Sequence, residues 1–404
     1  MKIVSIAPYM PFRGIAHAGG ELYRRHAELV AQDHDVLVVA PGDATNESAM
    51  ARGGNPSYRR LLVPPRLGRA FPGRRRFQRF LARMLPFLAV GPFLRALLSD
   101  DRAVAELRTA DRIELQWFDS VVLAPRLRRA FPGIPIIGFL HDVVSQGHLR
   151  MTLRRGISAK WRLLALVRFL LTVPLEKRVL QALSTAVVLS EKDRALLRRR
   201  GESTPVVVLP PPLDDTEMPA RPPEGPARSR DVLFVAALER YENEDAARWL
   251  LGDIWPVVRR TVPGAHLTIA GAGANEALRR EAARHHDVEL TGYVPSLRPY
   301  YERAAVAVVP MRLGAGVKLK GIVAMLWGVP VVATRVGAEG VGEPGCFVAV
   351  EDDAGAFANA VAGVLLDPAS AHELAGRAFA WAHDVHAAQG YRRSVEQLYA
   401  SSTD

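Results

Sequence analysis

The sequence predicts an α/β protein of two domains, each built on a mainly parallel sheet. Its 404 residues exceed the length over which a single hydrophobic core keeps growing. Apolar runs rich in Val and Ile alternate with helical patterns, which is typical of parallel strands joined by crossover helices. A proline-rich stretch interrupts this alternation near the middle of the chain. We therefore expect two doubly wound sheets joined by a linker.

The first domain is predicted at residues 1–210. Its first apolar run, residues 2–7, is soon followed by Pro8 and Arg13. This run is too short for the apolar core of a signal peptide, so it is interpreted as a buried strand. The predicted strands are residues 2–7, 35–40, 112–117, 134–140, 185–189 and 206–209.

The linker is predicted at residues 211–230, because seven prolines lie between residues 210 and 230 with little aliphatic content. The alternation restarts in a second domain at residues 231–385. Its predicted strands are residues 231–237, 266–270, 288–291, 305–309, 329–333 and 346–350. Its predicted helices are residues 244–261, 275–284, 318–327, 354–366 and 370–383. The remaining segment, residues 386–404, is predicted to form a terminal helix that packs back on the first domain.

Ligands of open parallel sheets bind beyond the carboxyl ends of the strands, where loops and helix N-termini present free N–H groups. Two such domains facing each other would form one cleft. Functional residues are therefore expected at the carboxyl ends of the strands.

The basic charge lies in the N-terminal half. Up to residue 215 there are 34 Lys and Arg against 19 Asp and Glu, and beyond it 19 against 23. Residues 51–100 hold 11 Arg and one acid, interleaved with Phe. This pattern suits an anionic membrane surface, whereas no recognised nucleic-acid module is present and no nucleic-acid partner is expected. The alternative is an ordinary solvated face in a chain with 47 Arg and six Lys.

The sole cysteine, Cys346, cannot form an intramolecular disulfide, which fits a reducing cytoplasm. Charged residues interrupt the apolar segments Phe80–Leu98 and Trp161–Leu175, so neither is predicted to span a membrane. Each would lie on a surface or in a core. The expected location is cytoplasmic, with the option of peripheral contact at the inner face of the membrane.

A glycine pair, Gly19-Gly20, ends the loop after the first predicted strand and opens a helix. Glycine lets backbone amides approach a phosphate closely, and the helix dipole favours the negative charge. A plain turn explains the pair equally well.

Two polar side chains follow other predicted strands. His141 ends the strand at residues 134–140, where an imidazole can hydrogen-bond a sugar hydroxyl or stabilise developing charge. The alternative is a histidine that only caps a strand. Arg240 follows the strand at residues 231–237 and would either reach a diphosphate or pair with Glu239 or Glu244.

The two lysines of the C-terminal half, Lys318 and Lys320, both lie in the glycine-rich segment Gly314–Lys320. Compact positive charge at the start of a helix suggests phosphate binding, since cations there otherwise oppose the helix dipole. Residues two apart on a helix point in different directions, so one lysine is expected to reach the ligand. We favour Lys318, which is nearer the loop.

With these residues in place, the chain resembles the retaining glycosyltransferases of family 4, or group 1. The resemblance rests on an ordered set of short motifs along nearly the whole chain. They are Gly19-Gly20, His141-Asp142, Val188-Leu189-Ser190, Asp253-Ile254-Trp255-Pro256, Thr291-Gly292-Tyr293-Val294, Leu297–Tyr301 and Gly314–Met325. It implies the GT-B fold, with two Rossmann-like domains facing across a cleft.

The resemblance also implies transfer of a sugar from a nucleoside-diphosphate sugar to a hydroxyl of a lipid-linked, polysaccharide or natural-product acceptor, with retention and without a metal or other cofactor. His141 would hydrogen-bond the donor sugar near the reacting carbon, and Lys318 would neutralise the leaving diphosphate. The residues implied to contact the donor are Gly19, Gly20, Arg240, Gly292, Tyr293, Val294, Gly314, Ala315, Gly316, Val317, Lys318, Val323 and Glu339.

The chain departs from the family pattern at three positions, and at one of them Ala236 replaces the usual glycine after a strand. Ala315 and Val323 stand where the family usually has glutamates, the first directed at the sugar and the second at the ribose. Glu339 or Glu343 would take over the ribose contact. These departures leave a second hypothesis open, a non-catalytic homologue that acts as partner or scaffold of an active transferase. Nucleotide-sugar epimerisation is a further alternative.

Overall fold

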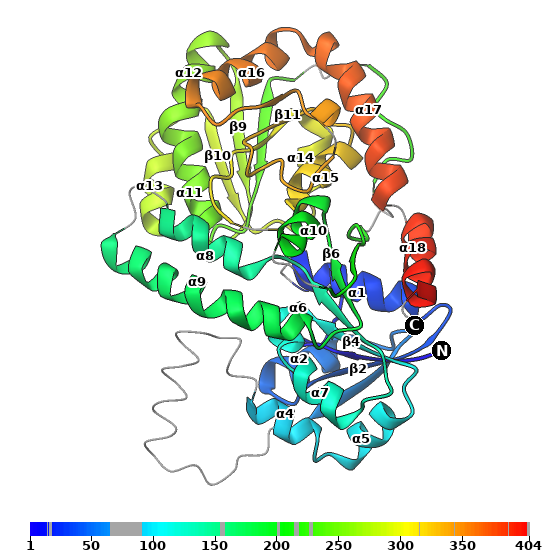
Figure 1. Ribbon diagram of the computed structural model, residues 1–404. Helices are drawn as coiled ribbons and strands as arrows, with labels where there is room; N and C mark the ends of the chain where they lie inside the picture. Colours follow the sequence, from blue (N-terminus) through cyan, green and yellow to red (C-terminus); the bar gives the residue numbers. More distant parts are fainter. Residues whose placement is uncertain are drawn as a thin grey trace. The chain divides into compact units, whose positions relative to one another are not determined.

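The structure is a computed structural model that describes residues 1–13, 15, 18–64, 91–153, 158–199, 203–213, 218–225, 229–314, 316–342, 344–386 and 388–401. The chain forms two compact units, Met1–Leu213 with Ala388–Asp404, and Asp214–Ala387. Each unit has its own parallel sheet with helices around it (Figure 1). The predicted class, two doubly wound α/β domains, is confirmed.

The described part of the first unit holds a seven-stranded parallel sheet in the order β3-β2-β1-β4-β5-β6-β7. Its strands are β1 Lys2–Ile6, β2 Asp35–Pro41, β3 Arg59–Val63, β4 Arg112–Gln116, β5 Ile136–Leu140, β6 Thr185–Val188 and β7 Val206–Val208. Its helices are α1 Ala18–Val30, α2 Ala44–Arg52, α4 Gly91–Leu97, α5 Asp101–Arg108, α6 Trp117–Val121, α7 Ala124–Ala130, α8 Val144–Leu153, α9 Ala159–Leu180, α10 Glu191–Arg198 and α18 Ala388–Ser401.

Both faces of this sheet are buried under apolar clusters. Successive strand residues point to opposite sides of the sheet, so neighbouring residues enter different clusters. Val4 and Val39 belong to one apolar cluster, whereas Ile3 and Val38 belong to the other. Tyr399 of α18 is part of the second cluster. The last helix of the chain therefore packs on the first unit.

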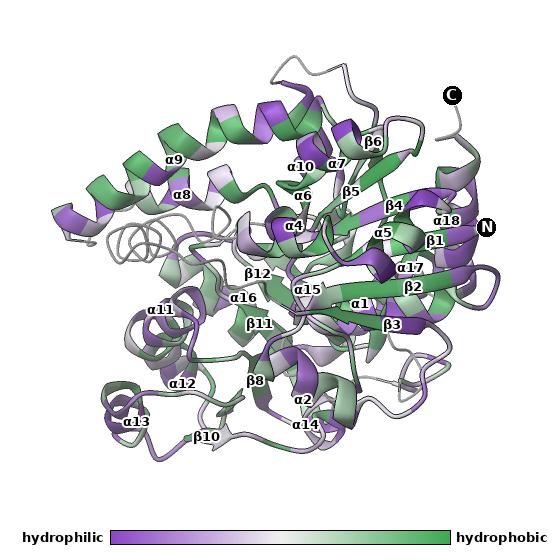
Figure 2. Cartoon of the chain, turned by 90° about the horizontal axis from the view of Figure 1, so that it is seen from below, coloured by the Kyte–Doolittle hydropathy of each residue, from purple (hydrophilic) through white to green (hydrophobic). Residues whose placement is uncertain are grey.

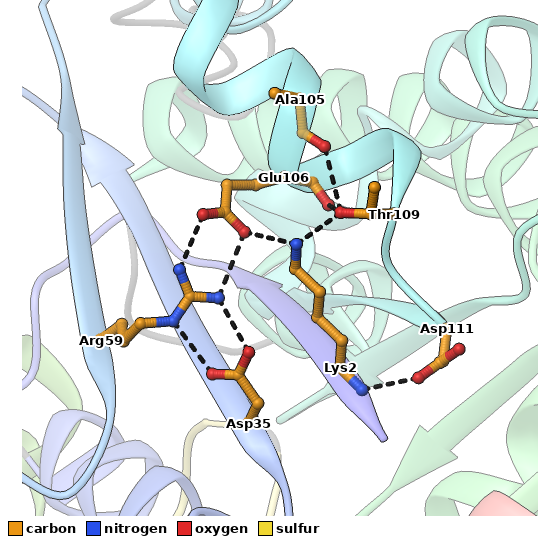
Figure 3. Close-up of polar contacts among 7 residues, drawn as sticks. All are labelled: Lys2, Asp35, Arg59, Ala105, Glu106, Thr109 and Asp111. Carbon is orange, nitrogen blue, oxygen red and sulfur yellow. Dashed lines mark hydrogen bonds and ion pairs between the residues drawn. The ribbon is translucent and has the colours of Figure 1, made fainter.

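Strand β3 is absent from the predicted strands, and this omission is corrected here. Its sequence carries two arginines, which hid the apolar pattern. Arg59 forms ion pairs with Asp35 of β2 and Glu106 of α5, at 2.9 and 2.7 Å (Figure 3). Lys2 of β1 also contacts Glu106, at 2.7 Å. These residues lie at the amino ends of β1, β2 and β3, so they hold the edge strand in place, away from the carboxyl ends of the sheet.

The arginine- and phenylalanine-rich stretch is described only in part. Residues 65–90 lie outside the described residues, and so does most of the segment Phe80–Leu98. Its end forms α4.

The described part of the second unit holds a six-stranded parallel sheet in the order β10-β9-β8-β11-β12-β13. Its strands are β8 Asp231–Val235, β9 His266–Ala270, β10 Val288–Gly292, β11 Ala304–Val309, β12 Val331–Ala333 and β13 Ala349–Val350. Its α-helices are α11 Tyr241–Trp249, α12 Trp255–Thr261, α13 Glu276–Ala282, α14 Arg298–Arg303, α15 Leu319–Leu326, α16 Ala354–Leu366 and α17 Pro368–His386, and a 3-10 turn spans Pro344–Cys346.

The single helix predicted at residues 244–261 is wrong in one respect. A π-helical turn, Leu250–Ile254, separates α11 from α12. Pro256 lies at the start of α12. Proline lacks the N–H that would bond to the carbonyl of Gly252, so the regular α-helical ladder cannot continue through this point.

The chain order of the strands changes direction at one place in each sheet. In the first unit this occurs between β1 and β4, and in the second between β8 and β11. Loops that leave such neighbouring strands diverge to opposite faces of the sheet and leave a crevice at their carboxyl ends. These two places are where functional residues are expected.

Candidate functional site

The carboxyl edge of the first sheet brings His141 against Trp117. Trp117 directly follows β4, and His141 directly follows the neighbouring strand β5. Their rings are stacked, with centroids 4.6 Å apart and planes 11° from parallel. The Nε2 atom of His141 lies 3.4 Å from Oε1 of Gln116. The imidazole is thus held by residues of the adjacent strand.

Gly19 lies against the other side of this arrangement, in the first turn of α1. A Cβ atom added at Gly19 would lie 3.1 Å from Nε1 of Trp117. Glycine at this position therefore allows α1 and the indole to approach closely. The buried Gly20 follows in the same turn. The structure thus brings the predicted residues Gly19 and His141 together around one tryptophan.

Trp117 is a site residue that the sequence did not reveal, because it was assigned to the end of a strand. Its φ is +60°, a conformation that costs a non-glycine residue about 1–3 kcal/mol and often marks a functional site. The indole also meets Tyr23 and Tyr9 edge to face, at 5.4 and 5.9 Å. Its signal in the sequence is limited to its place at the carboxyl end of a predicted strand.

A buried polar network supports the end of β4. Glu114 accepts a hydrogen bond from the hydroxyl of Tyr399 in α18 and contacts His26 at 3.0 Å, and His26 lies 2.7 Å from the hydroxyl of Tyr391. Burial alone would raise the pKa of Glu114, but His26 and the hydrogen bonds outweigh it, so the pKa is lowered. The terminal helix is thereby linked to the strand that carries Gln116.

The glycine-rich loop of the second unit follows β11, at the place where the strand order changes. Gly314 and Gly316 have φ of +103° and +71°, which glycine tolerates best. Ala315 lies outside the described residues. Lys318 is only 8% exposed, and its Nζ donates a hydrogen bond to the carbonyl oxygen of Gly316 at 2.8 Å. The side chain of Lys318 therefore folds back along the loop and holds a positive charge there, beside the half-buried Val317.

Lys320 points elsewhere. Its Nζ donates to Oδ1 of Asn243 at 2.9 Å and lies 4.9 Å from the ring centre of Phe234. Burial, and then the nearby charges of Lys318 and Arg240, lower the pKa of Lys320 to about 7. The two lysines have different partners, as their spacing predicts.

The lowered pKa of Lys320 makes stability depend on pH. Between about pH 7 and the ordinary lysine pKa of 10.5, the unfolded chain binds a proton that the folded chain lacks, so the unfolding free energy rises with pH. Below about pH 7 both states are protonated, and the full cost of the buried charge is present. Lys320→Met is expected to remove this rise. Chemical denaturation from about pH 6 to 9 measures it, and parallel pH curves for variant and wild type would contradict the expectation.

Arg240 lies beside the glycine-rich loop. It directly precedes α11 and forms an ion pair at 2.5 Å with Glu242. The alternative of an ion pair with Glu239 or Glu244 is therefore corrected, because the partner is Glu242. The Cγ of Glu242 would lie 3.9 Å from a Cβ added at Gly314. The start of α11 and the loop after β11 thus form one charged edge.

Comparison with protein families accounts for both units. Residues 21–212 match the glycosyl transferase 4-like domain, and residues 229–367 match the domain described as glycosyl transferases group 1. The chain belongs to the group 1 glycosyltransferases. The predicted resemblance is thereby confirmed at the level of the group.

Curated relatives match this glycosyltransferase over part of its length. An uncharacterised 44.6 kDa protein in the cps region of Klebsiella pneumoniae is 35% identical over 120 residues, which are 28% of this chain and 31% of the relative. Glycogen synthase of Mycobacterium tuberculosis is 36% identical over 167 residues, 38% of each chain. This chain thus spans about a third of the length of the curated relatives it matches.

Solved structures match the full length and show the GT-B fold. HepE from Anabaena, in complex with UDP and glucose, has a TM-score of 0.69 and 13% identity, covering 99% of this chain and 100% of its own. Sucrose-phosphate synthase from Thermosynechococcus elongatus has a TM-score of 0.72 and 19% identity, covering 99% of each chain.

Three of the predicted donor contacts, Gly292, Tyr293 and Val294, lie at the end of β10 in this glycosyltransferase. Gly292 has a φ of +68°, and a Cβ added there would meet no atom within 4 Å. Tyr293 is exposed and Val294 is half-buried. Their backbone lies at the carboxyl edge of the same sheet as the glycine-rich loop.

The position of the expected ribose carboxylate is taken by Val323, half-buried on α15. Glu339 follows β12, partly exposed, whereas Glu343 lies outside the described residues. The turn before Glu339 is fixed by Thr334, whose hydroxyl accepts the N–H of Gly337 at 2.9 Å and donates to the carbonyl of Met311. Thr334 therefore ties this turn to the start of the glycine-rich loop, a role that the sequence did not reveal.

Proposed function

We propose that this protein transfers a sugar from a nucleoside-diphosphate sugar to a hydroxyl group of a lipid-linked, polysaccharide or natural-product acceptor. The observation that carries the proposal is the buried Lys318, whose ammonium is held on the Gly314–Gly316 loop at the carboxyl end of β11. Positive charge with nearby backbone amides is suited to a diphosphate. HepE, a structural relative, has been solved with UDP-glucose, which supports this donor class.

In the proposed reaction, the bond between the anomeric carbon and the diphosphate breaks, and a bond to the acceptor oxygen forms. The hydroxyl proton passes to the leaving diphosphate, and attack on the same face gives retention. Lys318 stabilises the negative charge that develops on the diphosphate, so the protein rather than a metal supplies the positive charge. His141 hydrogen-bonds the donor sugar, held in position by Trp117.

Binding of nucleotide sugars tests the proposal. The protein would be titrated with UDP-, GDP- and dTDP-sugars by calorimetry, and turnover would then be sought with hydroxyl acceptors. We expect one nucleotide class to bind. Failure of every nucleotide and nucleotide sugar to bind would exclude the donor assignment.

Val323→Glu is expected to strengthen donor binding. The variant restores a carboxylate able to accept hydrogen bonds from ribose hydroxyls, worth about 1.5–3 kcal/mol, or roughly one to two decades of affinity. The control is Val323→Gln, which has a similar length but no charge and should gain less. Calorimetry with the preferred nucleotide measures both, and weaker binding by the Glu variant would show that α15 does not face the ribose.

A second candidate is a non-catalytic homologue that serves as partner of an active transferase, and Val323 is the observation that favours it. Such a protein would bind acceptor or partner without turning donor over. Release of nucleoside diphosphate that depends on an acceptor, by the purified protein alone, would exclude this candidate.

For location, we propose a cytoplasmic protein that contacts an anionic membrane surface through its basic first unit. The net charge of the N-terminal half and the lone cysteine support this proposal. In the described part of the chain, no helix is long and apolar enough to cross a membrane.

A further inference from the structure

Helices α8 and α9 of the first unit pack along one another (Figures 1 and 2). The longer helix, α9, carries a row of exposed aliphatic side chains, and its apolar residues appear as green segments of the ribbon in Figure 2. We call this row the apolar stripe; it consists of Leu163, Leu166, Val167, Leu170 and Leu171. The spacing of three or four residues places them on one face of the helix. Leu163 and Leu170 are 63% and 59% exposed.

The opposite face of α9 contains polar residues that are buried. Thr172 and Glu176 are almost inaccessible, and Glu176 accepts a hydrogen bond from the backbone N–H of Ser145 in α8 at 3.0 Å. A surface helix of a globular protein normally buries its apolar face and exposes its polar face. Along the apolar stripe, α9 does the reverse. The segment Trp161–Leu175, predicted to lie on a surface or in a core, lies on a surface.

Two further exposed apolar side chains lie where α8 ends and α9 begins. Trp161, at the start of α9, is 56% exposed, and Leu153, at the end of α8, is also exposed. Tryptophan is enriched where an apolar layer meets water, because its ring is amphipathic. Exposed apolar side chains of this helix pair thus occur on both helices, in addition to the stripe on α9.

The charges around this area are nearly all positive. Residues 144–180 contain eight Lys and Arg against one acid, and that acid, Glu176, is the buried one. Lys160 and Arg178 are exposed toward the two ends of α9. His148 of α8 adds no charge at neutral pH, because burial and then Arg168 lower its pKa to about 4. An apolar stripe with a basic border matches an anionic lipid surface.

We propose that α9 lies in the interface of an anionic bilayer, with the apolar stripe inserted among the acyl chains and the basic residues at the headgroups, while α8 packs against its opposite face. An anionic lipid surface explains both the apolar stripe and its basic border, whereas a contact between two copies of this surface would bring like charges together. Helix α9 would lie along the surface. This inference rests on the proposed function to the extent that it names the surface on which a lipid-linked acceptor would meet the enzyme.

Flotation with vesicles tests this proposal on the full-length protein. Vesicles of phosphatidylcholine alone would be compared with vesicles that also contain phosphatidylglycerol, at low and high salt. We expect binding to the anionic vesicles that salt weakens but does not abolish, since inserted leucines do not respond to screening. Absence of binding to anionic vesicles, or binding that high salt removes completely, would overturn insertion of the stripe.

Paired variants locate the contact. Leu163→Gln with Leu170→Gln is expected to lower the partition coefficient at least about tenfold. Lys160→Glu with Arg178→Glu is expected to weaken binding to anionic vesicles only. The matched control is Leu366→Gln, at a leucine that is 61% exposed on the second unit, and it should bind as wild type does. A leucine pair that binds like wild type would place the contact elsewhere.

Analytical sedimentation of the protein without lipid tests the alternative that the stripe binds a second copy of this chain. If the wild type forms a dimer that the leucine pair dissociates, and vesicles do not bind, the stripe is an interface between copies and the lipid proposal is wrong. Nucleotide binding by the same variants keeps the two proposals apart. If the leucine pair loses vesicle binding but keeps its nucleotide affinity, the stripe binds lipid independently of the donor site. If the wild type binds vesicles but no nucleotide, the membrane proposal stands and the donor proposal fails.

Discussion

Lys318→Ala is expected to weaken the binding of the nucleoside diphosphate by about ten- to a hundredfold, and to lower turnover by more. A hydrogen bond to a charged group is worth about 1.5–3 kcal/mol, which sets the loss in affinity. Turnover suffers further, because charge grows on the diphosphate as it leaves and a single preorganised donor contributes roughly a factor of 10²–10³.

The position of the Lys318 ammonium explains why a large effect is expected from this substitution. The Nζ of Lys318 is fixed on Gly316 of its own loop, so the charge is in place before any ligand arrives. Preorganised charge in a nearly inaccessible position acts more strongly than the same charge in water. Calorimetry with UDP, GDP and dTDP measures the affinity, and release of nucleoside diphosphate measures turnover.

Two control variants separate charge from shape. Lys318→Met keeps the length of the side chain and should resemble Lys318→Ala. Arg335→Ala removes an exposed cation that follows β12 in the same unit, and it should bind nucleotide as wild type does. Equal affinities of all three variants and the wild type would exclude the glycine-rich loop as the phosphate site.

Much of the fold could be predicted because it is encoded locally. Alternating apolar runs and helical patterns located most strands. Strand β3 was missed because Arg59 and Arg60 interrupt its apolar pattern, and because the contacts that place it, with β2 and with Glu106, join segments far apart in the sequence. The break between α11 and α12 had a local signal in Pro256, and it was overlooked inside a longer periodic pattern.

The candidate site divides in the same way. The phosphate role of Lys318 could be predicted from short-range spacing alone, because this lysine belongs to the glycine-rich segment itself. Trp117 did not, because its role depends on β4 and β5 being neighbours and on a positive φ that no residue type announces. The partner of Lys320, Asn243, lies 77 positions away. Contacts between distant segments are what the sequence alone leaves open.

His141→Ala is expected to lower kcat by roughly a hundredfold with little change in KM for the donor. We place this imidazole on the donor sugar near the reacting carbon, where its contribution grows as charge develops, and such an interaction is lost from kcat and kcat/KM together. Steady-state rates at varied donor concentration measure it. The control is His286→Ala, at an exposed histidine of the second unit, which should leave both constants unchanged.

Trp117→Phe extends this expectation to the residue that holds the imidazole. The smaller ring keeps an aromatic face for His141 but reduces the stacked area between the two rings, whose centroids lie 4.6 Å apart in the wild type. A smaller loss of kcat is therefore expected than for His141→Ala. Because the two residues act as one unit, the double variant should lose about as much as His141→Ala alone. Losses that multiply in the double variant would show that Trp117 acts independently of His141, as a structural residue of the β4 edge.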